Sequence, residues 1–317
     1  MRIVIPGGTG QIGRLLTRHF YERGDDVAVL SRDALVEPWQ TVVWNARDLD
    51  IWAGELEGAD VLINLTGRSV DCRYTPTHRK EIKESRVLST EILGEAVALC
   101  RRPPQVWLNA STATIYRHAL DREMDEIDGE LGGNEPGLPD TWRFSIDVAK
   151  SWENAFFHAQ TPMTRKVALR SAMTMSPVDG NVFSVLLRLV RMGLGGAAGP
   201  GTQFMSWIHE EDFLRAVDFL IEHDDFEGPV NLASPFPIPN QEFMRDLREA
   251  WGADFGIDSA RWMLEAGAFF LRTETELILK SRRVVPRRLL EAGFEFLFPD
   301  WPEAARNLLF AKRRHRL

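Results

Sequence analysis

The chain has 317 residues, of which 26% are charged and 44% hydrophobic, and its formal net charge is −8 at pH 7. A chain of this length can bury a large core, and its acidic balance argues against a nucleic-acid surface. Its apolar runs are too short to span a membrane, and we expect no secretory leader. The two cysteines, Cys72 and Cys100, show neither a disulfide framework nor a metal-ligand spacing. We therefore expect a cytoplasmic protein without a metal site.

The N-terminus contains the most informative motif. A β-branched run at residues 2–6 and an amphipathic stretch at residues 11–23 enclose Gly7, Gly8, Gly10 and Gly13. A strand, a glycine-rich turn and a helix in this order form a dinucleotide-binding site, because the glycines let the backbone approach a pyrophosphate and the helix start attracts its charge. The alternative is a glycine-rich turn that binds no phosphate. The position of this motif favours a bound dinucleotide.

The end of the next predicted strand, at residues 26–31, indicates which dinucleotide is bound. An acidic residue about 20 residues beyond the glycines would bind the ribose 2′-hydroxyl of NAD. This chain instead has Ser31 and Arg32, a hydroxyl and a guanidinium suited to a 2′-phosphate. The sequence therefore predicts NADP, although Arg32 as a plain surface residue is the alternative interpretation.

Strands and helices alternate in the first half of the chain. We predict a short helix at residues 48–58, long helices at 78–100 and 142–159, and buried strands at 59–65, 105–110 and 164–170. This alternation predicts an α/β fold with a doubly wound parallel sheet, and we assign residues 1–176 to an NADP-binding Rossmann domain. Glu81 and Arg86 lie near one face of the first long helix, where spacing alone allows either a surface ion pair or a ligand contact.

The pattern changes beyond Pro177. A glycine-dense stretch at residues 193–201 separates predicted helices at 182–192, 210–223 and 240–251, with a strand at 229–232. We expect residues 177–317 to form a smaller α/β lobe that closes over the cofactor, with some later segments returning to the first domain. The sequence leaves the oligomeric state open.

Motifs spread over nearly the whole chain resemble those of a known group. They are the seven residues from Gly7 to Gly13, Leu-Ser-Arg at 30–32, Asn-Leu-Thr-Gly at 64–67, Lys-Glu-Ser-Arg at 83–86, Arg-Ser at 170–171, Gly-Leu-Gly-Gly at 193–196, Ser-Trp-Ile-His at 206–209 and the stretch at 285–294. Together they resemble the extended short-chain dehydrogenases/reductases, and within them the atypical NAD(P)-dependent epimerase family with a C-terminal domain of unknown function.

The resemblance implies where NADP is bound. The implied contacts in the glycine loop are Thr9, Gln11 and Ile12, and those at the 2′-phosphate are Ser31 and Arg32. It also implies Leu65 and Thr66 beside the adenosine half, Glu81 and Arg86 from the long helix, and Thr174, more weakly, near the nicotinamide.

The expected catalytic pair of the superfamily is missing. Active short-chain dehydrogenases use a Tyr-x-x-x-Lys pair, in which lysine lowers the tyrosine pKa for proton transfer. Here Phe144 or Ser145 stands in place of the tyrosine, and Val148 or Ala149 in place of the lysine.

The remaining catalytic candidates lie after the strand at residues 105–110. Ser111 and Thr112 stand where the superfamily has its substrate-binding hydroxyls, and Tyr116 is a candidate proton donor. The alternative for Tyr116 is an aromatic side chain packed under the acidic loop. We expect His209, at a helix start, to shape the lobe rather than to catalyse.

Two functions follow from these observations. The first is an NADP-binding oxidoreductase or epimerase-like protein that acts on an unknown small, sugar-like substrate, and the glycine-rich stretch and the lobe favour it. The second is a non-catalytic NADP-binding regulator, which the missing pair favours. A purely structural scaffold has no positive support.

Overall fold

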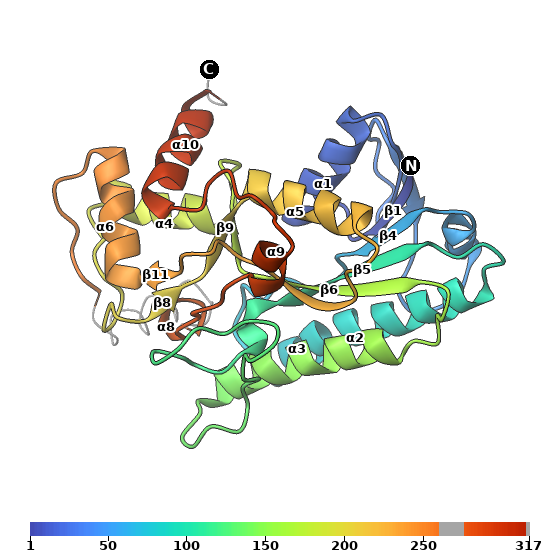
Figure 1. Cartoon of the computed structure of the whole chain (residues 1–317), viewed down its shortest axis with the longest axis horizontal. Helices are drawn as coiled ribbons and strands as arrows, with labels where there is room; N and C mark the ends of the chain where they lie inside the picture. Colours follow the sequence, from blue (N-terminus) through green and yellow to red (C-terminus); the bar gives the residue numbers. More distant parts are fainter. Residues whose placement is uncertain (260–275, 315–317) are drawn as a thin grey trace.

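A seven-stranded parallel sheet forms the centre of the protein. The computed structural model describes residues 1–259 and 276–314, and it confirms the predicted doubly wound α/β fold. The strand order is β10-β6-β5-β4-β1-β2-β3 (Figure 1). The strands are β1 (Arg2–Pro6), β2 (Asp26–Ser31), β3 (Gln40–Val43), β4 (Val61–Asn64), β5 (Val106–Thr112), β6 (Arg165–Ser171) and β10 (Gly228–Leu232).

Helices cover both faces of this sheet. Helices α1 (Gln11–Glu22) and α5 (Glu210–Glu222) lie on one face, and α2 (Pro76–Leu99) and α3 (Asp140–His158) lie on the other (Figure 1). Two short 3₁₀ helices, η1 (Ile51–Leu56) and η2 (Ala113–Ile115), follow β3 and β5. The long helices therefore bury the sheet on both sides, which is the usual requirement of parallel strands.

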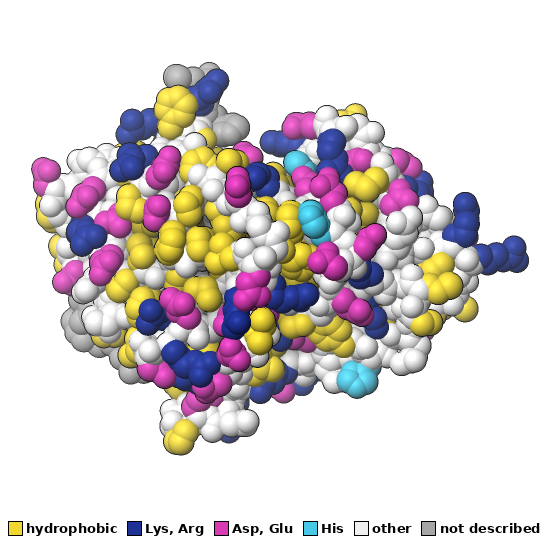
Figure 2. Space-filling view, viewed as in Figure 1, with side chains coloured by type: hydrophobic (Ala, Val, Ile, Leu, Met, Phe, Trp, Pro, Cys, Tyr) yellow, Lys and Arg dark blue, Asp and Glu magenta, His cyan; other side chains and the backbone are white. Residues whose placement is uncertain are grey.

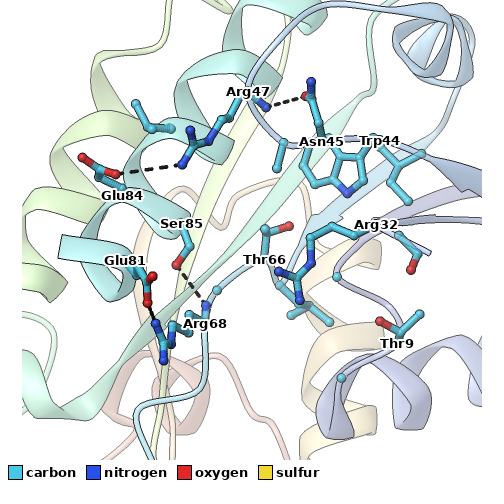
Figure 3. A pocket seen from close by; sticks show the side chains of 18 of the residues that line it. Thr9, Arg32, Trp44, Asn45, Arg47, Thr66, Arg68, Glu81, Glu84 and Ser85 are labelled. Atoms are coloured by element: carbon cyan, nitrogen blue, oxygen red, sulfur yellow. Dashed lines mark hydrogen bonds and ion pairs between the residues drawn. The ribbon is translucent and has the colours of Figure 1, made fainter. Parts of the chain in front are cut away.

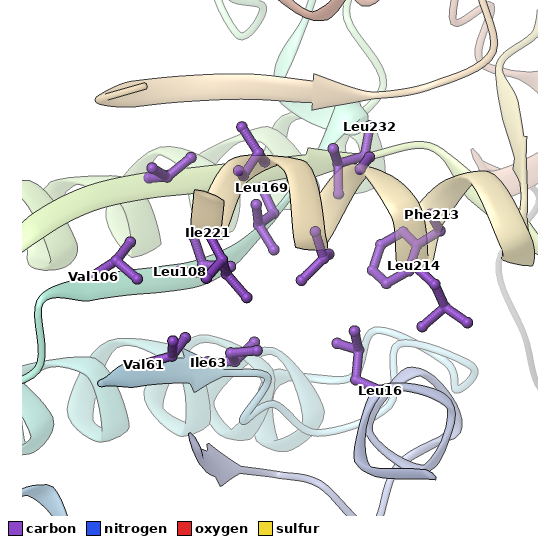
Figure 4. Close-up of a cluster of buried hydrophobic side chains, with 14 of the residues drawn as sticks. Leu16, Val61, Ile63, Val106, Leu108, Leu169, Phe213, Leu214, Ile221 and Leu232 are labelled. Carbon is purple, nitrogen blue, oxygen red and sulfur yellow. The ribbon is translucent and has the colours of Figure 1, made fainter. Parts of the chain in front are cut away.

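The alternation of side chains along each strand divides the core into two layers. On β5, Val106 and Leu108 pack toward α5, whereas Trp107 packs on the opposite face against Phe156 of α3. Figure 4 shows the first layer, in which strand side chains meet Phe213 of α5 and neighbouring apolar residues. The middle strands are apolar over most of their length because both of their faces are covered.

A smaller lobe begins where β6 ends. Its core contains Phe183, Trp207, Phe243 and Trp301, and the rings of Phe243 and Trp301 stack with centroids 3.8 Å apart. The elements of the lobe and its connections are β7 (Met173–Met175), α4 (Val182–Arg191), β8 (Phe204–Met205), β9 (Trp207–His209), β11 (Ile238–Pro239), α6 (Asn240–Trp251), α8 (Glu276–Leu279), α9 (Arg287–Glu291) and α10 (Trp301–Arg314).

The chain leaves this lobe and returns to the sheet. Helix α5 packs on α1, and β10 then pairs in parallel with β6, in the register Gly228↔Val167. The lobe is therefore discontinuous in sequence.

On the face seen in Figure 2, acidic and basic side chains are interspersed, as on an ordinary globular surface.

The sequence analysis missed the shortest strands. Strand β3 has four residues, and β7, β8, β9 and β11 have two or three each. Segments of this length carry too few residues to display a period. Strand β5 also extends beyond the predicted residue 110 to Thr112. Over residues 1–259 and 276–314, no helix combines the length and the apolar character that a membrane span needs.

The central position of β5 leads to a stability prediction. Leu108 is fully buried in the first core layer, so Leu108→Ala leaves a cavity and should lower the free energy of unfolding by about 3 kcal/mol. Val43→Ala, at an edge-strand position that is 52% exposed, should lower it by less than about 1 kcal/mol. Urea unfolding of both variants measures the difference, and equal losses would contradict this account of the core.

Candidate functional site

A pocket of about 690 Å³ opens at the carboxyl ends of β1, β2 and β4. The strand order reverses between β1 and β4, and ligands of doubly wound sheets bind at such a switch point. We call this the switch-point pocket. Of the predicted site residues, it is lined by Gly7, Thr9, Gly10, Ser31, Arg32, Leu65, Thr66 and Glu81.

The glycine loop has the geometry of a phosphate-binding turn. Gly7 has a φ of +79°, and a side chain there would also collide with the backbone of Leu65, because its Cβ would lie 2.8 Å from the Leu65 carbonyl carbon. A Cβ on Gly13 would lie 2.5 Å from the Gly7 oxygen, so only glycine lets α1 approach the loop this closely.

The start of α1 fits an anionic ligand. Gly10 is its N-cap residue and provides no side-chain cap, and the first turn contains no acidic residue. The amide groups of the first turn therefore have no carboxylate or hydroxyl from the cap position to satisfy them. Amides in this arrangement, together with the positive end of the helix dipole, bind phosphate groups.

Arg32 extends from the end of β2 into the switch-point pocket (Figure 3). Within the part of the chain that the structure describes, no carboxylate forms an ion pair with Arg32. Ser31 is more enclosed, and its Oγ accepts a hydrogen bond from the amide of Asp33 at 3.3 Å. The guanidinium of Arg32 is thus the group best placed to receive a second anion beside the phosphate loop.

The loop after β3 contributes residues that the sequence analysis missed, Trp44, Asn45 and Arg47. The Oδ1 atom of Asn45 accepts hydrogen bonds from the amides of Arg47 and Asp48, at 2.9 and 3.0 Å. This tight turn brings Arg47 to the rim, where its Nη2 lies 4.0 Å from a carboxylate oxygen of Glu84. The only local signal was the run Thr41-Val-Val-Trp44, which is too short to be identified as a strand with a functional loop.

Helix α2 forms the opposite wall of this pocket. Glu81 lines the wall in an ion pair with Arg68, and the Arg68 amide donates to Ser85 Oγ at 2.9 Å. Figure 3 shows both contacts. Glu81 therefore forms the ion pair, and its contact with a cofactor stays a prediction that its place in the pocket wall allows.

Arg86 points away from the switch-point pocket. Its Nη1 donates to the carbonyl oxygens of Arg68 and Ile82, both at 3.0 Å, and its guanidinium lies over the ring of Trp152. Burial lowers the pKa of Arg86 to about 10, and the nearby Tyr74 phenol partly offsets this effect. Arg86 lines a second cavity, on the far side of α2.

This second cavity, of about 260 Å³, contains the predicted hydroxyls Ser111 and Thr112. We call it the Tyr74 cavity, because the side chain of Tyr74 enters it from the loop before α2. The Tyr74 hydroxyl lies 3.4 Å from Ser145 Oγ, and Ser145 donates a hydrogen bond to Glu276. The four α3 residues at the positions of the missing Tyr-Lys pair also line it: Phe144, Ser145, Val148 and Ala149.

Three predicted residues border a third cavity, of about 360 Å³, which we call the lobe cavity. Gln11, Ile12 and Thr174 line it together with residues of α4 and α6. The Gln11 side-chain amide donates to the carbonyl oxygen of Gly180, which ties the start of α1 to the loop before α4. The structure therefore divides most of the predicted site residues among three cavities, while Gly13 is buried beneath the loop and Tyr116 lines none of the three.

Tyr116 is enclosed in a polar network. It is 1% exposed, its hydroxyl accepts from Arg170 Nη1 at 2.9 Å, and it donates to Asn231 Oδ1 at 3.0 Å. Burial raises the pKa of Tyr116 to about 12. A proton donor must reach its substrate, and among the residues described Tyr116 lines none of the three cavities. Its proton-donor role stays a prediction that this geometry does not favour.

Ser111 belongs to the same network. Its Oγ donates to Glu153 Oε1 at 2.6 Å, and Arg170 binds both carboxylate oxygens of Glu153 at 2.8 Å. The Ser111 hydroxyl proton is therefore committed to Glu153, and its oxygen can only accept a hydrogen bond from a ligand. Thr112 Oγ1 accepts from the amide of Thr114 at 3.2 Å, which leaves its proton available to a ligand.

His209 has a structural arrangement. It caps α5, because its Nδ1 accepts from the amide of Glu211 at 3.1 Å, and its Nε2 lies 3.2 Å from Asn307 Oδ1. The ring is 1% exposed and packs on Phe298. Burial lowers the pKa of His209 to about 4, with the Asn307 contact opposing that shift.

In the described ranges, acidic, histidine and cysteine side chains form no group of three or more that could hold a metal ion.

Comparison with known proteins identifies the family. Residues 3–233 match the NAD dependent epimerase/dehydratase family, and residues 260–308 match a domain of unknown function, DUF1731. The chain belongs to the epimerase/dehydratase family. This confirms the resemblance seen in the sequence, although residues 260–275 of the second match lie outside the described part.

Relatives match over nearly the full length. The chain is 30% identical over 315 residues to epimerase family protein SDR39U1 of Bos taurus, covering 98% of this chain and 100% of the relative. It is also 30% identical over 295 residues to an epimerase family protein of Mycobacterium tuberculosis, covering 93% of each chain.

Two solved structures share this fold. The crystal structure of human SDR39U1 (isoform 2) with NADPH has a TM-score of 0.84 and 28% identity, covering 97% of this chain and 99% of that one. A nucleoside-diphosphate sugar epimerase from Corynebacterium glutamicum has a TM-score of 0.75 and 26% identity, covering 99% of this chain and 60% of that one.

The pKa of His209 predicts a pH-dependent stability. An unfolded histidine titrates near pH 6.5, so between pH 6.5 and 4 the unfolded chain binds more protons than the folded one. Stability is therefore full above pH 6.5 and falls as the pH drops toward 4. Between pH 7 and pH 5, the free energy of unfolding of the wild type should fall by about 2 kcal/mol more than that of His209→Asn. The asparagine keeps an acceptor for the helix cap. Urea unfolding at each pH tests this, and parallel curves for the two proteins would refute it.

Proposed function

We propose that this chain binds NADP in the switch-point pocket and uses it to oxidise, reduce or epimerise a small molecule. The observation that carries the proposal is Arg32, a guanidinium without an ionic partner in the described chain, placed beside a phosphate loop. A ribose 2′-phosphate would supply the missing anion. The NADPH named with the human SDR39U1 structure supports the same choice.

Different residues would contact different parts of the cofactor. The first-turn amides of α1, with Thr9 and Gly10, would hold the pyrophosphate, and Leu65 and Thr66 would border the adenosine half. Ser31 would join Arg32 at the 2′-phosphate. Gln11, Ile12 and Thr174 lie toward the lobe and so would border the nicotinamide end. When bound, NADP supplies hydride chemistry, and the protein supplies orientation and protons.

We assign the role of proton donor to Tyr74. Reduction of a carbonyl group needs a proton at its oxygen, and Tyr74 has the tyrosine hydroxyl that enters the cavity beside Ser111 and Thr112. The guanidinium of Arg86 interacts electrostatically with this phenol, as the lysine does with the tyrosine in other short-chain dehydrogenases. Thr112 would donate to the carbonyl oxygen, and Ser111 would accept from a hydroxyl.

The alternative is a non-catalytic NADP-binding regulator. The apolar side chains at positions 148 and 149 favour it, since neither can act as an acid or base. Turnover distinguishes the two functions. An enzyme oxidises NADPH in the presence of a suitable carbonyl compound, whereas a regulator binds NADPH tightly and leaves every member of a broad panel unreduced.

The cofactor assignment predicts a selective loss on substitution. Arg32→Ala should weaken NADPH binding about 10- to 100-fold, because charge-assisted hydrogen bonds to the 2′-phosphate are lost, and should change NADH binding little. Arg102→Ala, a surface change outside the pocket, is the matched control. Calorimetric titration with both nucleotides measures the effect. Equal losses for NADPH and NADH would remove the 2′-phosphate argument.

The two tyrosines give opposite predictions. Tyr74→Phe should lower turnover about 100-fold and leave NADPH affinity unchanged, because only the proton donor is lost. Tyr116→Phe should instead lower the free energy of unfolding by about 1 to 3 kcal/mol, because it removes the hydroxyl between Arg170 and Asn231. Turnover per folded molecule should persist in that variant. A turnover loss confined to Tyr116→Phe would restore Tyr116 as the donor and exclude Tyr74.

A further inference from the structure

The lobe cavity is not accounted for by the dinucleotide alone. It begins at the start of α1 and at residues 171–174 after β6, and it extends between α4 and α6 into the lobe. Its volume of about 360 Å³ equals the share of about twelve liquid waters, and it lies in the range of small-molecule sites.

The walls of this cavity are apolar. Its apolar part is lined by Leu186, Leu189, Met205 and Met244, with Leu194 at the rim. Among the described residues that line it, none is Asp, Glu, Lys, Arg or His. These described residues would give a charged ligand no ion pair in exchange for the hydration that it loses, which makes its binding to them unfavourable.

Most polar atoms in the walls are committed to the fold. The Asn181 side chain caps α4 by accepting from the Ser184 amide at 2.9 Å, and its amide group donates to the carbonyl oxygens of Ser176 and Val178. Asn240 Oδ1 accepts from the Ala198 amide at 2.7 Å. The α4 terminus is thus already capped, and a diphosphate would find no cation among the described lining residues.

The end of the cavity nearest the sheet differs from its apolar part. Ser171 and Thr174 line this end, and Ser171 pairs with Thr112 across the β5–β6 ladder. Neighbouring strands lie about 4.8 Å apart, so a lining residue of the lobe cavity lies beside a lining residue of the Tyr74 cavity at this point. A ligand in the lobe cavity can therefore present one polar group to Ser171 and Thr174, next to Thr112, while its apolar part occupies the lobe.

From these observations we infer that the lobe cavity binds an uncharged, largely apolar small molecule with a single carbonyl or hydroxyl group at the Ser171 end. This substrate class rests on the proposed function for its chemistry. Reduction would take hydride from NADPH to the carbonyl carbon and one proton to its oxygen, which gives a secondary alcohol and NADP⁺. The described walls offer the diphosphate of a nucleoside-diphosphate sugar no cation.

Three probes separate the classes of ligand. 2-Decanone has the proposed character, decanoate carries the same chain with a charge, and UDP-glucose represents the nucleotide sugars. Calorimetric titration of the full chain, with and without NADPH, should show binding of 2-decanone, binding of decanoate weaker by about tenfold or more, and no binding of UDP-glucose.

A pair of variants locates the binding. Leu189→Trp fills the cavity from α4 and should weaken the binding of 2-decanone about tenfold or more. The affinity for NADPH should not change. Val185→Trp, on the same helix at a position that is 55% exposed, is the matched control and should change neither. Circular dichroism checks the fold of both. If Leu189→Trp does not fold, Leu194→Trp at the cavity rim makes the same test, because that side chain is 38% exposed.

The outcomes distinguish this inference from the proposed function. The substrate class would be overturned if 2-decanone did not bind, or if UDP-glucose bound and Leu189→Trp abolished that binding. Either result would leave the cofactor assignment standing. Binding of 2-decanone that Leu189→Trp leaves unchanged would overturn the location. Absence of NADPH binding, with 2-decanone still bound and blocked by Leu189→Trp, would overturn the proposed function and support the cavity assignment.

Discussion

The ion pair between Arg170 of β6 and Glu153 of α3 holds together the part of the sheet where β5 and β6 each carry a residue that lines a cavity. Both side chains are about nine-tenths buried, and the pairing uses two hydrogen bonds of 2.8 Å. Two further contacts extend the network, from Glu153 to Ser111 on β5 and from Arg170 to Tyr116. Loss of one partner would leave a buried charge without compensation, so the position of the strand ends depends on all of these groups.

The network also limits what the site can do chemically. The Ser111 proton is used inside the protein, and Tyr116 is held between Arg170 and Asn231, so neither is free to serve as the superfamily's usual donor. The positions on α3 that would carry a tyrosine and a lysine instead line a cavity that Tyr74 enters from another segment. In the mechanism that we propose, a phenol and a guanidinium, supplied by the loop before α2 and by α2 itself, take the place of the usual phenol and ammonium.

Local features of the site could be predicted from the sequence, and features that depend on distant contacts could not. The glycine loop and Arg32 belong to one contiguous strand-turn-helix-strand unit, so spacing was enough to place them. Arg47 was missed because β3 has only four residues and finds its place by pairing with β2. The sequence left Tyr116 as either a proton donor or a packed aromatic side chain. Its hydroxyl binds Asn231, 115 residues later, which no local pattern reveals.

The order of the strands has a consequence for synthesis of the chain. Strand β6 lies between β5 and β10, yet β10 follows it only after the whole of α4 and α5. Until residues 228–232 leave the ribosome, β6 is an unpaired sheet edge, the kind of surface that promotes aggregation of nascent chains. The side-chain amide of Asn231 also donates to the carbonyl oxygen of Val285, so this hydrogen bond cannot form until Val285 has been synthesised. A truncated chain that ends before β10 should therefore depend on chaperones in a way that the complete chain does not.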